Sequence, residues 1–146
     1  PKTPKPRSSK IFHKIIIKDM ESSIIDYKLV TDSVLKQCFV NTSVEQPLFI
    51  QKCKKYNRYN VAQDRVLMLS QQALYLVSSK KVHTKIFLQE LHYVIKSQQS
   101  KEFILQFLGS IDIRINLMER EELLKLIKQH FAILCPEKGL RIYGIP

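Results

Sequence analysis

Short runs of alternating apolar and polar residues dominate the middle of the chain. The clearest run covers residues 111–117, where Ile, Ile, Ile and Leu alternate with Asp, Arg and Asn. Because successive side chains of a strand point to opposite faces, this alternation predicts a strand with one buried face and one solvated face. Short segments of this kind and continuous apolar runs, separated by polar turns, predict seven short strands in all, at residues 48–56, 65–70, 73–78, 82–88, 92–97, 103–108 and 111–117.

Two segments follow a helical period instead. Within residues 26–40, the apolar positions recur at intervals of three and four, which predicts an N-terminal helix. Within residues 117–134, Leu124, Ile127, Phe131 and Leu134 form one apolar stripe, which predicts an amphipathic C-terminal helix. We expect Asn116 to cap this second helix, because Glu119 follows it three residues later as in a capping box.

Seven strands joined by tight polar turns and followed by one helix favour a particular architecture. We predict an α+β fold that is mostly β: a seven-stranded antiparallel barrel or sandwich, capped by the C-terminal helix. An N-terminal helix and an extended arm are additions to this core. Residues 139–145 form a further edge-strand candidate after the helix.

The first eighteen residues differ from the rest in composition. They are rich in Pro and carry six basic residues and no acid, which leaves +5 of the total net charge of +11 for residues 19–146. Such a segment cannot build a core, so we interpret residues 1–18 as an arm or linker and residues 19–146 as a single domain. The basic residues of the arm are Lys2, Lys5, Arg7, Lys10, Lys14 and Lys18.

Candidate chemistry is sparse. The three cysteines are odd in number and form no CxxC pair, and the four histidines are scattered, so neither a disulfide framework nor a metal site is indicated. No nucleophile–base pattern or phosphate-binding loop is present. We therefore expect a non-catalytic domain without cofactor, and any motor or catalytic module would lie outside this segment. No apolar run approaches the length of a membrane span.

The basic residues gather in one predicted strand–loop–strand. Residues 52–65 hold five cations and a single acid, Asp64. A hairpin that holds cations around its loop suits a multiply charged phosphate headgroup, because close cations act jointly on one anion. The alternative is a solvated basic hairpin. The five candidate headgroup ligands are Lys52, Lys54, Lys55, Arg58 and Arg65.

Two neighbouring features extend this candidate site. Lys80, Lys81 and Lys85 lie on the next predicted hairpin and form either a secondary basic face or an ordinary exposed turn. Tyr56 and Tyr59 alternate with the basic residues of the first hairpin. Tyrosines in such positions stack on bases, lie at a lipid interface or pack against the hairpin itself.

Several phrases in residues 48–97 resemble the tail homology 1 (TH1) domain of class I myosins. They occur in the family's order: Leu48-Phe-Ile-Gln-Lys, Lys55-Tyr-Asn-Arg58, Asp64-Arg-Val-Leu-Met-Leu-Ser70 and Ala73-Leu-Tyr-Leu76. The resemblance implies a pleckstrin-homology-like fold that binds phosphoinositides through the loop between the first two strands. It places the two basic positions that flank this loop on Lys55 and Arg65.

Together these observations predict a module that binds anionic phosphoinositide headgroups and acts in the cytoplasm, peripherally at a membrane or the cytoskeleton. An alternative is a protein-interaction domain docked in a cytoskeletal or other large assembly, with the basic arm gripping an acidic partner. Nucleic-acid binding ranks last, because no recognition helix or aromatic strand signature is present.

Overall fold

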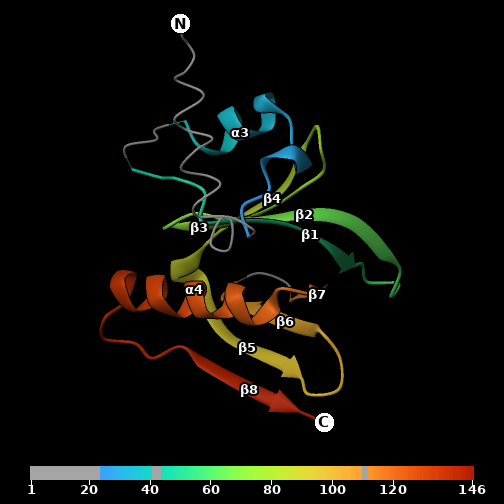
Figure 1. Cartoon of the computed structure of the whole chain (residues 1–146). Coiled ribbons are helices and arrows are strands. Elements are labelled where there is room, and N and C mark those ends of the chain that lie inside the picture. The colour runs from blue at the N-terminus through green and yellow to red at the C-terminus, as the bar shows by residue number, and fades with distance from the viewer. Residues whose placement is uncertain (1–23, 41–43, 110–111) are drawn as a thin grey trace, which may run out of the picture.

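The computed structural model describes residues 24–40, 44–109 and 112–146, so the predicted basic arm at 1–18 lies outside the described residues. Eight strands form one strongly curved sheet in the order β4-β3-β2-β1-β7-β6-β5-β8 (Figure 1). The strands are β1 (Phe49–Tyr56), β2 (Ala62–Leu69), β3 (Ala73–Val77), β4 (Val82–Phe87), β5 (Leu91–Ser97), β6 (Glu102–Phe107), β7 (Ile113–Asn116) and β8 (Arg141–Ile145).

The seven predicted strands are all present, and the mostly β architecture is confirmed. Neighbouring strands from β4 to β5 pair antiparallel, whereas β8 lies parallel to β5. Because β4 and β8 are the two edges of the described sheet, backbone pairing does not close the barrel. β8 occupies the segment in which the sequence predicts an edge strand.

The first three strands are apolar on both faces. On the inner face, Phe49, Leu67 and Leu76 join the main hydrophobic core of the barrel. On the outer face, Ile50 and Met68 belong to a second core that α3 (Asp32–Cys38) covers. Each side chain of these strands therefore has a defined face, and the pairing register determines it.

The predicted helix at 26–40 is divided in two. Tyr27–Leu29 form a 3₁₀ helix, η1, and Val30 is extended before α3 begins. The Thr31 hydroxyl caps α3 by accepting a hydrogen bond from the Val34 amide at 3.3 Å. The Thr31 amide itself donates to the Ser79 carbonyl, which ties the segment to the β3–β4 turn and interrupts the helix.

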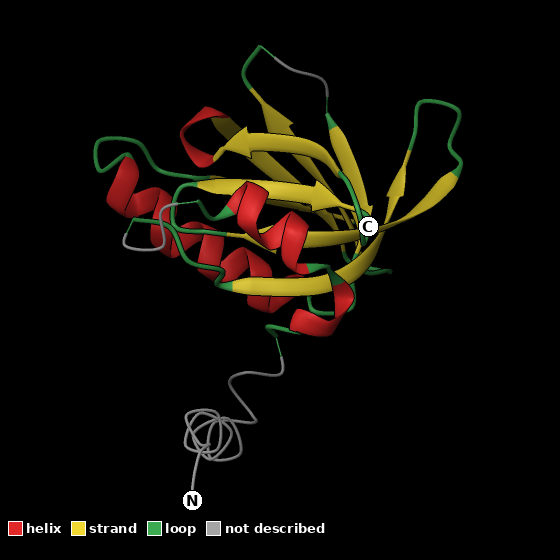
Figure 2. Cartoon of the chain, turned by 90° about the horizontal axis from the view of Figure 1, so that it is seen from above, coloured by secondary structure: helices red, strands yellow, loops and turns green. Residues whose placement is uncertain are grey.

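The C-terminal helix α4 (Arg120–Leu134) lies across the barrel and buries its apolar stripe in the main core (Figures 1 and 2). The expected cap was wrong: Asn116 is the last residue of β7 and pairs with Lys54 and Glu102, so its backbone serves the sheet. Glu119 occupies the N-cap position without a side-chain hydrogen bond.

Arg120 fastens the start of α4 to the sheet. It is buried, and its Nη1 lies 2.9 Å from each of three backbone carbonyl oxygens, those of Ser97, Ser100 and Glu102. A buried guanidinium is tolerated only where acceptors replace its water. The β5–β6 turn supplies these acceptors, so Arg120 fixes the position of the helix against the sheet.

Candidate functional site

The five predicted headgroup ligands lie on the β1–β2 hairpin but on different faces of it. Strand pairing extends to Tyr56↔Ala62, so the connecting loop is short and covers residues 57–61. Lys54 pairs with Asp64, and Lys52 pairs with Val66, on the outer face. Lys55 alternates with Lys54 along β1 and therefore points to the inner face.

Arg65 lies opposite Cys53 on the inner face, at the edge of the main core. Burial raises the pKa of the Cys53 thiol to about 12, an effect that the nearby Arg65 charge partly opposes. The Arg65 Nη1 donates to the Asp64 carbonyl at 2.7 Å, whereas its buried Nε has no hydrogen-bond partner. This Nε is enclosed by protein atoms and is not open to a ligand.

His83 on β4 lies within electrostatic range of cations from both hairpins. His83 is exposed, but partial desolvation lowers the pKa of its imidazole, and the positive charges of Arg65, Lys81 and Lys55 lower it further. The fold thus brings together residues from the β1–β2 hairpin and the β3–β4 hairpin. Among the ion pairs of residues 24–40, 44–109 and 112–146, none includes Lys55, Arg65 or Lys81.

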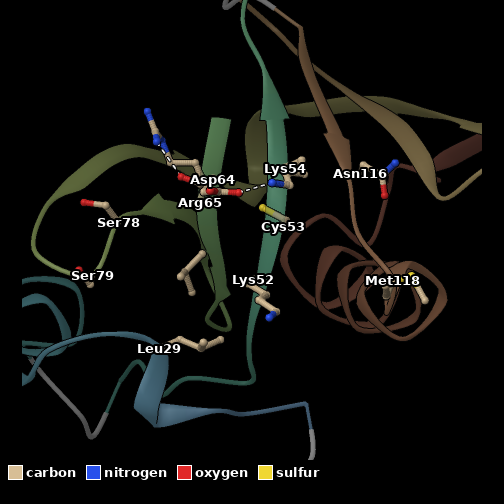
Figure 3. Close-up of a pocket in the computed structure, with 11 residues that line it drawn as sticks. Leu29, Lys52, Cys53, Lys54, Asp64, Arg65, Ser78, Ser79, Asn116 and Met118 are labelled. Atoms are coloured by element: carbon tan, nitrogen blue, oxygen red, sulfur yellow. Dashed lines mark hydrogen bonds and ion pairs between the residues drawn. The ribbon is translucent and has the colours of Figure 1, made fainter. Parts of the chain in front are cut away.

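The outer-face cations are in a different situation. Lys54 and Asp64 form an ion pair, which raises the pKa of the Lys54 amine and lowers that of the Asp64 carboxyl. Lys54 is therefore largely neutralised by its neighbour across the strands. Figure 3 shows the Asp64 carboxylate pointing toward the Lys54 amine.

A hollow of about 550 Å³ lies beside this ion pair (Figure 3). Leu29, Val66 and Met118 give it apolar walls, and Lys52, Lys54 and Arg65 contribute its cations. Met118 is largely exposed. The hollow therefore combines exposed apolar surface with positive charge, and Arg65, one of the predicted headgroup ligands, also lines it.

The secondary basic face is split in the same way. Lys81 belongs to the inner-face group around His83. Lys85 lies 4.9 Å from the ring centroid of Phe87 and 5.7 Å from that of Tyr75, a residue of the outer core. Lys80 is exposed in the turn between the two strands. The structure thus places Lys81, but not Lys85, beside the inner-face cations.

The loop at residues 57–61 is held by contacts that the sequence analysis did not single out. The Asn57 side-chain oxygen accepts from the Tyr59 amide at 2.9 Å and from the Val61 amide at 3.0 Å. Asn60 takes the left-handed backbone conformation, with φ +64°, which Asn adopts more readily than most residues. The two asparagines at these loop positions were the available sequence signal.

Arg114 on β7 supports the loop from the side. Its guanidinium lies 4.2 Å from the centroid of the Tyr56 ring and donates to the side-chain oxygen of Asn60. Its Nη2 lies 2.9 Å from the Glu102 carboxylate. Arg58, the fifth predicted ligand, projects from the loop and lies 5.1 Å from the centroid of the Tyr59 ring.

Other site types find no support in the residues described. Within 24–40, 44–109 and 112–146, no group of three His, Cys, Asp or Glu side chains is placed to hold a metal ion. The helices in these ranges are all too short or too polar to cross a membrane. The described surface carries cations from both the β1–β2 and the β3–β4 hairpins.

The chain matches a known family model. The model of a family described as "Unconventional myosin tail, actin- and lipid-binding" matches residues 27–143. The matched segment begins in η1 and ends in β8, so it includes both hairpins of the site and both described helices. A comparison of the sequence with curated proteins finds no match.

Solved structures resemble this chain in fold. The C-terminal domain of an unknown protein from Leishmania infantum is 16% identical, with a TM-score of 0.56 over 68% of this chain and 96% of that one. The hSac2 domain of the human phosphoinositide phosphatase Sac2 is 13% identical, with a TM-score of 0.57 over 78% and 87%. The N-terminal PH domain of human ARAP2 is 10% identical, with a TM-score of 0.53 over 68% and 89%. At these identities the comparisons establish the pleckstrin-homology-like fold.

Proposed function

The chain belongs to the unconventional myosin tail family, whose members are described as actin- and lipid-binding, and on this premise we propose that it is a non-catalytic module that targets anionic phosphoinositide membranes. The proposed headgroup ligands are Lys55 and Arg65 on the inner face of the β1–β2 hairpin. Lys52, Lys54 and Arg58 add positive charge around them. The module would then act peripherally, at a membrane or at the cytoskeleton.

The observation that carries this proposal is that three cations from two hairpins, none of them in a described ion pair, act electrostatically on one exposed side chain, His83. Arg65, Lys81 and Lys55 all lower the pKa of that imidazole, and no described carboxylate forms an ion pair with any of the three. Uncompensated like charges at close range cost free energy in the absence of a ligand. A multiply charged headgroup would relieve this repulsion, and Arg65 would bind a phosphate through its terminal Nη groups.

The expected strength is moderate and depends on salt. Each basic residue near an anionic membrane surface contributes about 1 kcal/mol, and this contribution falls with ionic strength. The inner-face cations and Arg58 would together give useful affinity for vesicles. Lys54 would contribute less, because Asp64 already neutralises it.

The test is cosedimentation with phosphatidylcholine vesicles that carry a few mole per cent of a phosphoinositide, at physiological salt. We expect the parent chain to bind and the Lys55→Glu/Arg65→Glu variant to bind at least about tenfold more weakly. The matched control is Lys125→Glu/Lys128→Glu, which makes the same change in net charge on exposed positions of α4. If the two variants lose binding equally, affinity depends on net charge alone and the headgroup site is refuted.

A second candidate function is binding to a protein partner of the cytoskeleton, with the basic arm at 1–18 as an additional grip. The family description, which names actin beside lipid, and the apolar hollow with its lysines both favour it. Cosedimentation with filamentous actin tests it. Met118→Ser removes an exposed apolar wall of the hollow without changing the charge, so it should weaken this binding while leaving vesicle binding largely intact, and unchanged actin binding would exclude the hollow.

A further inference from the structure

The β1–β2 loop exposes apolar side chains next to the basic residues. Tyr59 is 71% exposed and Val61 is 54% exposed, at the tip of the hairpin that carries Lys55 and Arg65. Their exposure has no explanation in the packing of this chain, since both side chains lie outside its two hydrophobic cores. Burial of this tyrosine and valine against another surface would be favourable, because it would remove their apolar area from water.

The loop holds these side chains in a preformed arrangement. The Asn57 side chain accepts from the amides of both Tyr59 and Val61, and the Asn57 amide donates to the Val61 carbonyl at 3.0 Å. Arg114 holds Asn60 from the neighbouring strand β7. A tip that is already ordered loses little conformational entropy when it enters a new environment.

The chemistry of the tip fits the boundary between lipid headgroups and acyl chains. Tyrosine prefers this boundary because its ring is apolar and its hydroxyl remains hydrated. Arg58 lies over the Tyr59 ring. On a membrane, its guanidinium would stay among the lipid headgroups while the Tyr59 ring enters the layer below them. The tip is too narrow to bury the area that a specific protein complex needs, whereas a fluid bilayer closes around a small projection.

We propose that Tyr59 and Val61 insert into the headgroup–acyl boundary of a lipid bilayer while Arg58 and the inner-face cations hold anionic headgroups. This inference rests on the proposed function, because the cations orient the domain with its hairpin toward the membrane. It adds a hydrophobic contribution that salt does not screen. A free headgroup in solution cannot supply that contribution, so the tip acts only on a membrane.

The chain contains no tryptophan, so a single introduced tryptophan reports on its own position. In Tyr59→Trp, the indole should be quenched by phosphoinositide vesicles whose phosphatidylcholine carries bromine on its acyl chains. Tyr143→Trp is the matched control, because Tyr143 is also exposed but lies on β8. Quenching of the Tyr59→Trp variant alone supports insertion. Vesicle binding with no quenching of this variant, or with equal quenching of both, overturns it.

A pair of binding measurements separates insertion from headgroup recognition. Tyr59→Ser/Val61→Ser should bind vesicles about tenfold more weakly than the parent, because two partly buried apolar side chains are lost. Its affinity for free inositol trisphosphate should be unchanged, since neither residue is among the proposed ligands. Tyr59→Ser/Val61→Ser and Tyr59→Trp should both unfold at the parent's urea midpoint, because the side chains of Tyr59 and Val61 lie outside both hydrophobic cores.

The outcomes distinguish the two proposals. If Lys55→Glu/Arg65→Glu loses inositol trisphosphate while the serine variant binds vesicles as the parent does, headgroup binding stands and insertion is refuted. If the charge variant still binds vesicles and Tyr59→Trp is still quenched, insertion stands and the headgroup site is refuted. A parent chain that binds no vesicles refutes both.

Discussion

At the scale of single residues, neighbouring cations on one strand have different environments. Lys54 and Lys55 are adjacent in sequence, yet Lys54 is paired with Asp64 on the outer face and Lys55 shares the inner face with Arg65. The alternation of a β-strand alone produces this difference. A run of basic residues on a strand therefore places only about half of its positive charge on each face of the sheet.

Arg120 supports a stability prediction. We expect Arg120→Leu to lower the free energy of unfolding by about 3 kcal/mol, because three backbone carbonyls around its Nη1 lose their donor. Urea denaturation followed by circular dichroism measures the change. Lys125→Leu makes a similar substitution at an exposed position of the same helix, and we expect it to change stability by less than about 0.5 kcal/mol.

His83 supports a prediction about pH. Its pKa in the folded protein lies below the ordinary value of 6.5, so the unfolded chain binds the proton more tightly. The free energy of unfolding should therefore decrease as the pH falls below about 6.5, and His83 should have little effect well above that pH. His83→Gln should reduce this loss of stability in acid.

Proton NMR titration of the His83 ring would measure the pKa directly. A midpoint at or above 6.5 in the parent chain would contradict the proposed crowding of cations. His92→Gln serves as the control for the stability measurement, since His92 is exposed on β5 and contacts Gln106. An equal effect of the two substitutions would assign the acid sensitivity to histidines in general.

At the scale of elements, the sequence predicts the strands well and their ends poorly. Short apolar segments separated by polar turns identified all seven barrel strands, because each strand contributes at least one face to a core. The sequence prediction for β2 began at residue 65 and missed its true start at Ala62. The first residues of β2 pair with β1 but do not contact a hydrophobic core. Pairing there depends on backbone hydrogen bonds and on the turn, and neither leaves an apolar signal.

Other features depend on partners distant in the sequence. Asn116 has the spacing of a capping box but serves β7, because pairing with both β1 and β6 uses its backbone. The face of each basic residue follows from the register of β1 against β2, which the sequence alone leaves open. The convergence of Lys81 with Arg65 depends on the position of the β3–β4 hairpin.

The hairpin loop gives a prediction at this scale. Asn57→Ala removes the acceptor for two loop amides, and we expect it to lower the free energy of unfolding by about 1 kcal/mol. Asn57→Asp keeps an acceptor oxygen in the same place and should recover most of this loss. Urea midpoints of the two variants measure the difference. An alanine variant as stable as the parent would show that the loop is not held by Asn57.

At the scale of the whole molecule, the sheet joins two hydrophobic cores. Strands β1–β3 contribute one face to the main core and the other to the core under α3. Loss of either core exposes one whole face of the same strands. We therefore expect the two cores to unfold in a single cooperative transition.

The three buried cysteines make this expectation measurable. Cys38 lies in the outer core, whereas Cys53 and Cys135 lie in the main core. Burial also raises the pKa of the Cys38 thiol to about 11, so native thiols should react slowly with alkylating agents. Pulsed alkylation at increasing urea, read by mass spectrometry, should label all three at one midpoint. Earlier labelling of Cys38 would mean that α3 detaches independently.

The parallel pairing of β8 with β5 determines where an attached polypeptide leaves the domain. Ile145 lies beside Ser97, at the β5–β6 turn, and not beside the β1–β2 loop. An affinity tag joined after Pro146 would anchor the protein to a sensor chip by this corner. The hairpin tip would then remain free to meet vesicles flowing over the chip, so immobilisation through the C-terminal end suits binding kinetics.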